Sequence, residues 1–135
     1  MANPTTTYFL ADGRLAINVT ENKTLALADC GIVQNVIADG VVVTLPATAA
    51  GFAFIVRNGG VKVTSGPTGA VADGSAVVKV SPAAADQISG VGLTPADDKD
   101  LINTKATSKV GDEVTLISET NGYTVSKLLG TWARE

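Results

Sequence analysis

The chain contains no histidine and only one cysteine, Cys30, among its 135 residues. These scarcities exclude a Ser-His-Asp triad, a Cys-His pair, and zinc sites built from histidine or from several cysteines. A single cysteine also excludes an intrachain disulfide and an iron–sulfur cluster held by this chain alone. We therefore expect Cys30 to pack as a small hydrophobic residue.

Charge is also scarce. Charged residues make up 17% of the chain, against roughly 25% in an average globular domain, and the net charge is −3. The ten Lys and Arg residues are scattered and form no basic stripe of the kind that binds nucleic acid. No apolar run approaches the ~20 residues of a membrane span, and the first residues do not resemble a signal peptide. We expect neither a nucleic-acid nor a membrane partner, and synthesis in a reducing cytoplasm.

Aromatic residues are rare, at 4% of the chain, whereas hydrophobic residues make up 45%. The core must therefore consist mostly of Val, Ile, Leu and Ala, which fill thin packed sheets better than deep, aromatic-lined pockets. An apolar, weakly charged chain of this kind favours a surface that is covered by a partner subunit or another protein. The alternative is a domain that is simply rich in Ala and Val.

Short runs of β-forming residues, separated by turn signals, are present from Thr24 onward. Asp39-Gly40 and Asn121-Gly122 each lie between two apolar runs and predict hairpins. Asn58-Gly59-Gly60 predicts a third hairpin, with residues 61–64 as its return strand. We count about nine to eleven strands and almost no helical periodicity. The pattern predicts an all-β fold, a compact antiparallel β-sandwich or barrel that is jelly-roll-like.

The first 22 residues are polar and rich in threonine. They predict an extended N-terminal arm, with a first strand as the alternative, followed by a single β domain over residues 23–135 without an internal repeat. An arm of this kind orders against a neighbour. The predicted interface residues are Tyr8, Phe9 and Leu10 in the arm, and Trp132 near the end of the chain.

Carboxylates are the remaining source of chemistry. Asp97, Asp98 and Asp100 could ligate calcium, but their spacing lacks the order of an EF-hand loop, which favours a solvated acidic loop. Most other aspartates lie beside glycine or in turn-like segments, where they cap backbone N–H groups. A phosphate-binding loop motif is absent from the sequence. We expect no catalytic residue, no metal and no cofactor, and hence a protein that is not an enzyme.

Several segments resemble small structural proteins of tailed bacteriophages. They occur in order along residues 24 to 133: Val43-Thr44-Leu45-Pro46-Ala47, Gly51 to Gly60, Val80-Ser81-Pro82, Asp86 to Gly90, Asn103 to Thr107, Lys109 to Asp112, and Gly122 to Ala133. The resemblance is greatest to capsid decoration proteins, also called cement or head-stabilising proteins. It implies a virion protein on the capsid's outer surface that binds at junctions between major capsid protein subunits and stabilises the head. It also implies a homotrimer, and it transfers no catalytic residue.

Other functions stay open from the sequence. A head-fibre or tail-spike module would bind a host receptor or glycan, with Trp132 or Tyr123 as sugar-stacking residues or with an acidic site. A carboxylate-based hydrolase would use the cluster around Asp97. The chain could also be a non-viral β domain, such as a subunit of a bacterial assembly.

Overall fold

The computed structural model describes residues 2–47, 51–60, 76–84, 86–90, 99–104 and 106–135. Within these ranges the chain forms twelve β-strands and one 3-10 helix, η1, which spans Leu27–Asp29. The strands are β1 (Thr7–Phe9), β2 (Leu15–Val19), β3 (Lys23–Thr24), β4 (Val33–Val36), β5 (Val41–Thr44), β6 (Ala53–Asn58), β7 (Val78–Ser81), β8 (Gln87–Ser89), β9 (Leu101–Asn103), β10 (Glu113–Glu119), β11 (Gly122–Leu129) and β12 (Ala133–Arg134). The predicted return strand at residues 61–64 lies outside the described residues.

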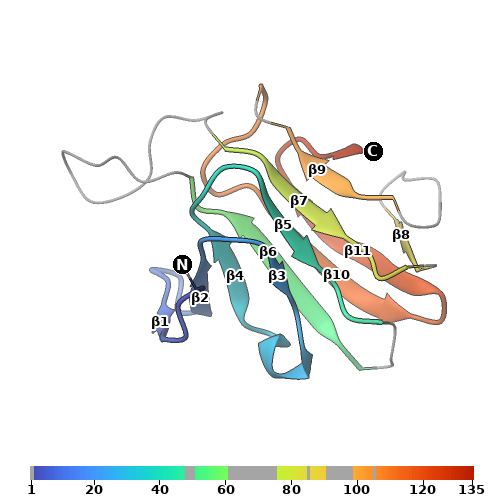
Figure 1. Cartoon of the computed structure of the whole chain (residues 1–135), viewed down its shortest axis with the longest axis horizontal. Helices are drawn as coiled ribbons and strands as arrows, with labels where there is room; N and C mark the ends of the chain where they lie inside the picture. Colours follow the sequence, from blue (N-terminus) through green and yellow to red (C-terminus); the bar gives the residue numbers. More distant parts are fainter. Residues whose placement is uncertain (1, 48–50, 61–75, 85, 91–98, 105) are drawn as a thin grey trace.

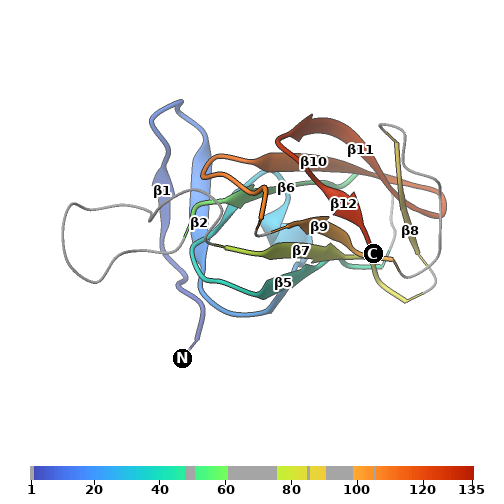
Figure 2. The ribbon, with the colours of Figure 1, turned by 90° about the horizontal axis from the view of Figure 1, so that it is seen from above.

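The strands assemble into two facing sheets (Figures 1 and 2). Sheet A has seven strands in the order β1-β2-β4-β6-β10-β11-β8, and sheet B has five in the order β12-β9-β7-β5-β3. The predicted all-β, sandwich-like fold is confirmed. Short strands with fully and partly buried positions in alternation, such as Val41–Thr44 and Ala53–Asn58, are typical of such a two-layer arrangement.

From β2 to β7 the chain passes back and forth between the two sheets. Strands β2, β4 and β6 lie in sheet A and pair in parallel, while β3, β5 and β7 lie in sheet B and also pair in parallel. Each turn of this coil therefore contributes one strand to each sheet. In sheet A, Ala16 pairs with Val33 and Val33 with Ile55, which are steps of 17 and 22 residues.

This coil corrects two predictions. Five of the ten strand pairings among the described residues are parallel, so the sheets are mixed and not antiparallel throughout. Jelly-roll connectivity, which is built from antiparallel Greek keys, is not confirmed. Asp39-Gly40 forms a turn but not a hairpin, because β4 and β5 belong to different sheets. The Gly40 N–H instead donates to the carbonyl of Val77 at 3.0 Å, and the Val77 N–H donates to Oδ1 of Asp39 at 2.8 Å.

The hairpin predicted at Asn121-Gly122 is confirmed. Strands β10 and β11 pair antiparallel across this turn, with a register shift between Thr115 and Leu116. The other edge of β10 pairs antiparallel with β6, so this hairpin extends sheet A beyond the parallel coil. Edge strand β8 then adds to β11 in parallel.

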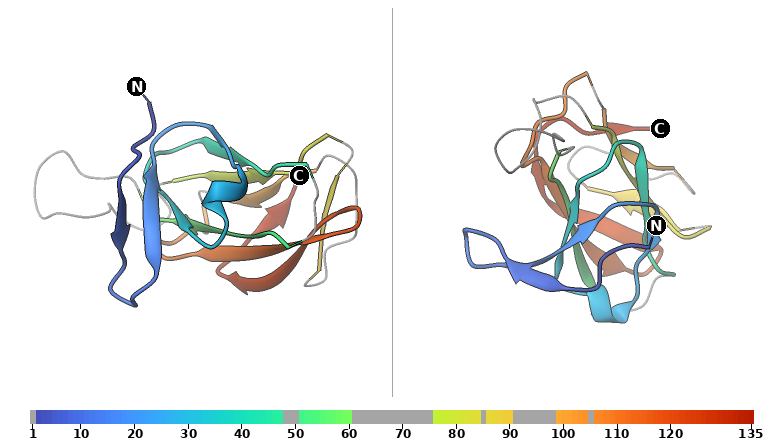
Figure 3. Two further views of the ribbon diagram at one scale, coloured as in Figure 1. Left: turned by 90° about the horizontal axis from the view of Figure 1, so that it is seen from below. Right: turned by 60° about the vertical axis from the view of Figure 1, so that its left-hand side comes forward.

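The N-terminal segment is built into sheet A. Strands β1 and β2 form an antiparallel hairpin, and β2 pairs with β4 on its other side. Residues 15–19 are therefore part of the sandwich, and the predicted boundary at residue 22 does not separate an arm from the domain. The reason is the apolar alternation of Leu15, Ile17 and Val19, which suits a strand covered on one face. The hairpin stands at one end of the sandwich and projects clear of it (Figure 3).

The core lies between the sheets and is mostly aliphatic, as predicted. Three aromatic side chains of this core form a short chain, in which the ring centroids of Phe52 and Phe54 are 6.0 Å apart and those of Phe54 and Tyr123 are 5.9 Å apart. The Tyr123 hydroxyl donates to the carbonyl of Pro46 at 3.1 Å. Burial of this side chain raises the pKa of Tyr123 to about 12.

A polar cluster lies inside the protein beside this apolar core. The Asn58 side-chain amide donates to Oδ1 of Asn103 at 2.7 Å, and the Asn103 amide donates to Oδ2 of Asp112 at 2.9 Å. The same amide of Asn103 donates to the carbonyl of Thr131 at 3.0 Å. Because these buried groups satisfy one another, they tie β6 of sheet A to β9 of sheet B.

Candidate functional site

A row of polar side chains crosses the outer face of sheet A. Its members, Tyr8, Asn18, Asn35, Arg57 and Glu113, are called the polar row below. The register places Asn18 beside Asn35, Asn35 beside Arg57, and Arg57 beside Glu113. The Tyr8 hydroxyl donates to Oδ1 of Asn18 at 2.5 Å, and the Arg57 guanidinium donates to Oδ1 of Asn35 at 2.8 Å. The row therefore links the N-terminal hairpin to the middle of the sheet.

Arg14 connects the tip of the hairpin to the end of this row. Its two terminal nitrogens donate to the two carboxylate oxygens of Glu113, each at 2.8 Å, and its Nε donates to Oδ2 of Asp12 at 2.8 Å. Glu113 is 2% exposed, so a partly desolvated, bidentate pair holds the hairpin against β10. The hydrogen bond to Glu113 raises the pKa of Arg14. Hydrogen bonds from the backbone and then the side chain of Arg14 lower the pKa of Asp12.

The four predicted interface residues lie in different settings. Phe9 is 74% exposed on β1, and it points away from the side of the hairpin that carries Tyr8. Tyr8 is half-buried and belongs to the polar row. Leu10 is half-buried in the turn, where its N–H donates to the carbonyl of Arg14 at 2.8 Å.

Trp132 differs from the other three because it is buried, with 9% of its surface exposed, and packs in the core between the sheets. Its ring N–H donates to the carbonyl of Leu129 at 2.9 Å. Neither Trp132 nor Tyr123, which is 1% exposed, presents a ring face to solvent. The two aromatic residues considered for sugar stacking are thus used by the core.

The outer face of sheet A also exposes apolar side chains next to the polar row. Ile117 and Leu129 are 42% and 47% exposed, on the paired strands β10 and β11. Ile117 is paired with Ala53, and Leu129 with Glu113. Exposed Lys127, which is paired with Thr115, lies between them on the same face, so the two apolar side chains are separated by polar ones.

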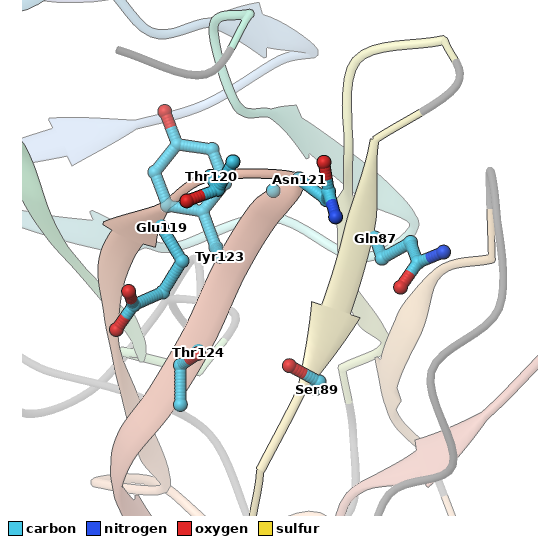
Figure 4. A pocket seen from close by; sticks show the side chains of 8 residues that line it. Gln87, Ser89, Glu119, Thr120, Asn121, Tyr123 and Thr124 are labelled. Carbon is cyan, nitrogen blue, oxygen red and sulfur yellow. The ribbon is translucent and has the colours of Figure 1, made fainter. Parts of the chain in front are cut away.

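A polar hollow lies at the opposite end of sheet A, between β8 and the β10–β11 turn (Figure 4). It has a volume of about 320 Å³ and is lined by Gln87, Ser89 and residues 119–124. Gly122, one of these lining residues, is paired with Glu119 on one side and with Gln87 on the other. This hollow was not predicted, because β8 and the turn come together only through a parallel pairing of distant segments.

Within the described ranges, no three His, Cys, Asp or Glu side chains gather closely enough to hold a metal ion. Asp97 and Asp98 lie outside those ranges, and the N–H of Asp100 donates to a side-chain oxygen of Glu135 at 3.3 Å. Cys30 accepts a hydrogen bond from the N–H of Ala53 at 3.2 Å. No helix in the described part of the chain has the length and apolar character needed to cross a membrane.

A scan against protein-family models and a search of the curated proteins both found no match to this chain. The structure itself defines the class: a small, two-sheet, all-β protein with a parallel coil, a projecting N-terminal hairpin and a polar row across one face.

Sequence reasoning missed most of the polar row. Arg14 and Glu113 carry no local signal, since they are 99 positions apart. A signal for two members, Asn18 and Asn35, does exist in the triplets Ile17-Asn18-Val19 and Gln34-Asn35-Val36, where a side-chain amide precedes a valine in consecutive turns of the coil. An alignment of these triplets would have placed Asn18 beside Asn35.

Proposed function

We propose that this chain is a non-enzymatic structural protein of a phage virion. In this proposal it binds the outer surface of the capsid, at junctions between major capsid protein subunits, and stabilises the head. The proposal rests on the resemblance to decoration proteins together with the surface described above. The projecting β1–β2 hairpin takes the role expected of an N-terminal arm.

The single observation that supports this proposal most is the exposure of Phe9 on that hairpin. A phenylalanine with 74% of its surface in water gains roughly 1.5–3 kcal/mol when a partner buries it fully. The Arg14–Glu113 pair restricts the hairpin before binding, which lowers the entropy lost when it docks. An exposed aromatic side chain on a hairpin that an ion pair restrains is a suitable anchor for a pocket on another protein.

Self-association belongs to the same proposal. A homotrimer would present three copies of the hairpin, and three weak contacts on one particle gain affinity through effective concentration. Cyclic symmetry would match such a trimer to a symmetric junction of the capsid lattice. The measurement is the solution mass at micromolar concentration: a trimer supports this part, and a strict monomer contradicts it.

The capsid proposal is tested with heads that lack this protein, purified from a tailed phage that encodes it. Added wild-type protein should co-sediment with the heads and raise the temperature at which they open. Phe9→Ala should weaken binding about tenfold or more. Leu27→Ala is the matched control, because Leu27 is 63% exposed but lies in η1, away from the hairpin.

Two outcomes would count against the proposal. Wild-type protein that fails to bind its own phage's heads would refute the decoration role. Equal losses from Phe9→Ala and Leu27→Ala would refute the hairpin as the anchor, while leaving the role itself standing.

A further inference from the structure

Two backbones lie close together beside the hollow between β8 and the β10–β11 turn. Gly122 has a φ of 142°, and a Cβ atom placed there would lie 2.0 Å from the carbonyl oxygen of Gln87. No side chain can therefore occupy this position while β8 pairs with β11. The Gln87 backbone fills the space beside Gly122, so β8 lies close to the β10–β11 hairpin, and side chains from both line the hollow.

The hollow is lined by polar side chains, most of which can both donate and accept hydrogen bonds. The hairpin supplies the Glu119 carboxylate, the Asn121 amide and the hydroxyls of Thr120 and Thr124, and β8 adds the hydroxyl of Ser89 (Figure 4). Ser89 is paired with Thr124, so their hydroxyls lie on the same face of the sheet. The set contains one pure acceptor and four groups that both donate and accept, and it includes no Lys or Arg.

We propose that this hollow binds a single neutral sugar residue. Sugar hydroxyls donate and accept together, which matches the amide and hydroxyl walls, and two adjacent hydroxyls can donate to the carboxylate of Glu119. The described residues of the lining include no Lys or Arg, so the same carboxylate repels acidic sugars. The volume of about 320 Å³ is near the lower end of the range for small-molecule sites, which suits one residue of a glycan.

Two competing ligand classes fit the hollow less well. A divalent cation such as calcium takes six to eight oxygens, commonly from several carboxylates, and Glu119 is the one carboxylate among the described residues that line the hollow. An aromatic ligand would need an apolar or stacking wall, yet the Tyr123 ring is 1% exposed and faces the core. Without a stacking platform we expect a dissociation constant on the order of 1 mM.

The inference goes beyond the proposed capsid role and does not depend on it. The Phe9 hairpin and the hollow lie at opposite ends of sheet A, on β1 and on β8 with the β10–β11 turn. Head binding and sugar binding can therefore fail separately. Loss of one in a variant should leave the other unchanged.

The test is an NMR titration of the ¹⁵N-labelled full chain. The probes are neutral methyl hexosides and N-acetylhexosaminides, with glucuronate, N-acetylneuraminate and calcium chloride as the competing classes. At least one neutral sugar should shift the amide signals of residues 119–124 and of Ser89 in a saturable way. Glu119→Gln and Thr124→Val should each weaken this binding about tenfold or more.

Ser126→Ala is the matched control, because Ser126 is an exposed hydroxyl residue of β11 outside the hollow. It should bind the sugar as the wild type does. Saturable shifts by acidic sugars or calcium alone would overturn the assignment. So would the absence of saturation with every neutral sugar, shifts mapped to another face, or Glu119→Gln binding as tightly as the wild type.

Discussion

Arg14 and Glu113, 99 positions apart in the sequence, meet through two parallel hydrogen bonds of 2.8 Å. This bidentate pair joins the tip of the N-terminal hairpin to the first residue of β10. The hairpin has few other restraints at its tip, where the described contacts are the turn bonds of Leu10 and the ion pair of Asp12. The pair thus restrains the tip of the hairpin, while the pairing of β2 with β4 and the contact of Tyr8 with Asn35 hold the rest of it.

We predict that Arg14→Ala lowers the free energy of unfolding by about 3 kcal/mol, because it leaves the buried Glu113 carboxylate without its partner. Urea unfolding measures this change. Asp12→Asn is the control, since the Asp12 side chain is 52% exposed and its loss should cost less than about 1 kcal/mol. Equal effects of the two variants would show that the Glu113 contact does not restrain the hairpin.

Substitutions at two glycines with similar backbone angles distinguish the cost of a steric clash from the cost of backbone strain. Gly13 and Gly130 have φ values of 87° and 90°, but a Cβ at Gly13 meets nothing within 4 Å, whereas one at Gly130 would lie 2.2 Å from the Asp112 carboxyl carbon. Gly13→Ala should cost about 1 kcal/mol through backbone strain alone. Gly130→Ala should cost several times more, or prevent folding, because it displaces a buried carboxylate. Thermal unfolding of both variants distinguishes these costs, and similar melting temperatures would contradict the close packing at Gly130.

The buried amide of Asn103 should be among the least replaceable side chains. Asn103→Ala removes the groups that bond Asn58, Asp112 and the carbonyl of Thr131, and it leaves those polar atoms buried. We expect a loss of about 3 kcal/mol of stability. Thr104→Ala, at the next residue and exposed, should change stability by less than about 0.5 kcal/mol. A mild effect of Asn103→Ala would mean that water satisfies the cluster.

Turn dipeptides predicted where the chain turns but not which strands pair. Asn121-Gly122 and Asp39-Gly40 have the same local signal, and only the first closes a hairpin. The difference lies in long-range packing, since Asp39 and Gly40 bond to Val77 from a later turn of the coil. In the structure β4 is buried at every position, as is typical of an internal strand with parallel neighbours, and the two amide residues in its sequence, Gln34 and Asn35, gave no sign of this.

The coil itself escaped prediction because its turns have unequal lengths. Lys23 pairs with Val43 and Val43 with Val80 in sheet B, which are steps of 20 and 37 residues. A fixed period, the usual sequence signal of a coiled β architecture, is therefore absent. The hollow around Gly122 was equally hidden, since the glycine reads as a turn residue until β8 is placed against it.

Tyr123 should couple stability to alkaline pH. Its pKa is about 12 in the folded protein, raised by burial from about 10 in the unfolded chain, so the folded state holds this proton more tightly. The contribution is complete below pH 10 and is lost as the pH rises toward 12. Tyr123→Phe removes the hydrogen bond to Pro46 and should cost about 1 kcal/mol at pH 8. Between pH 10 and 12 only the wild type loses the tyrosine contribution, so the difference in unfolding free energy between the two proteins should narrow. Urea unfolding across this range, with tyrosinate absorbance recorded in parallel, measures both quantities, and a constant difference would contradict the raised pKa.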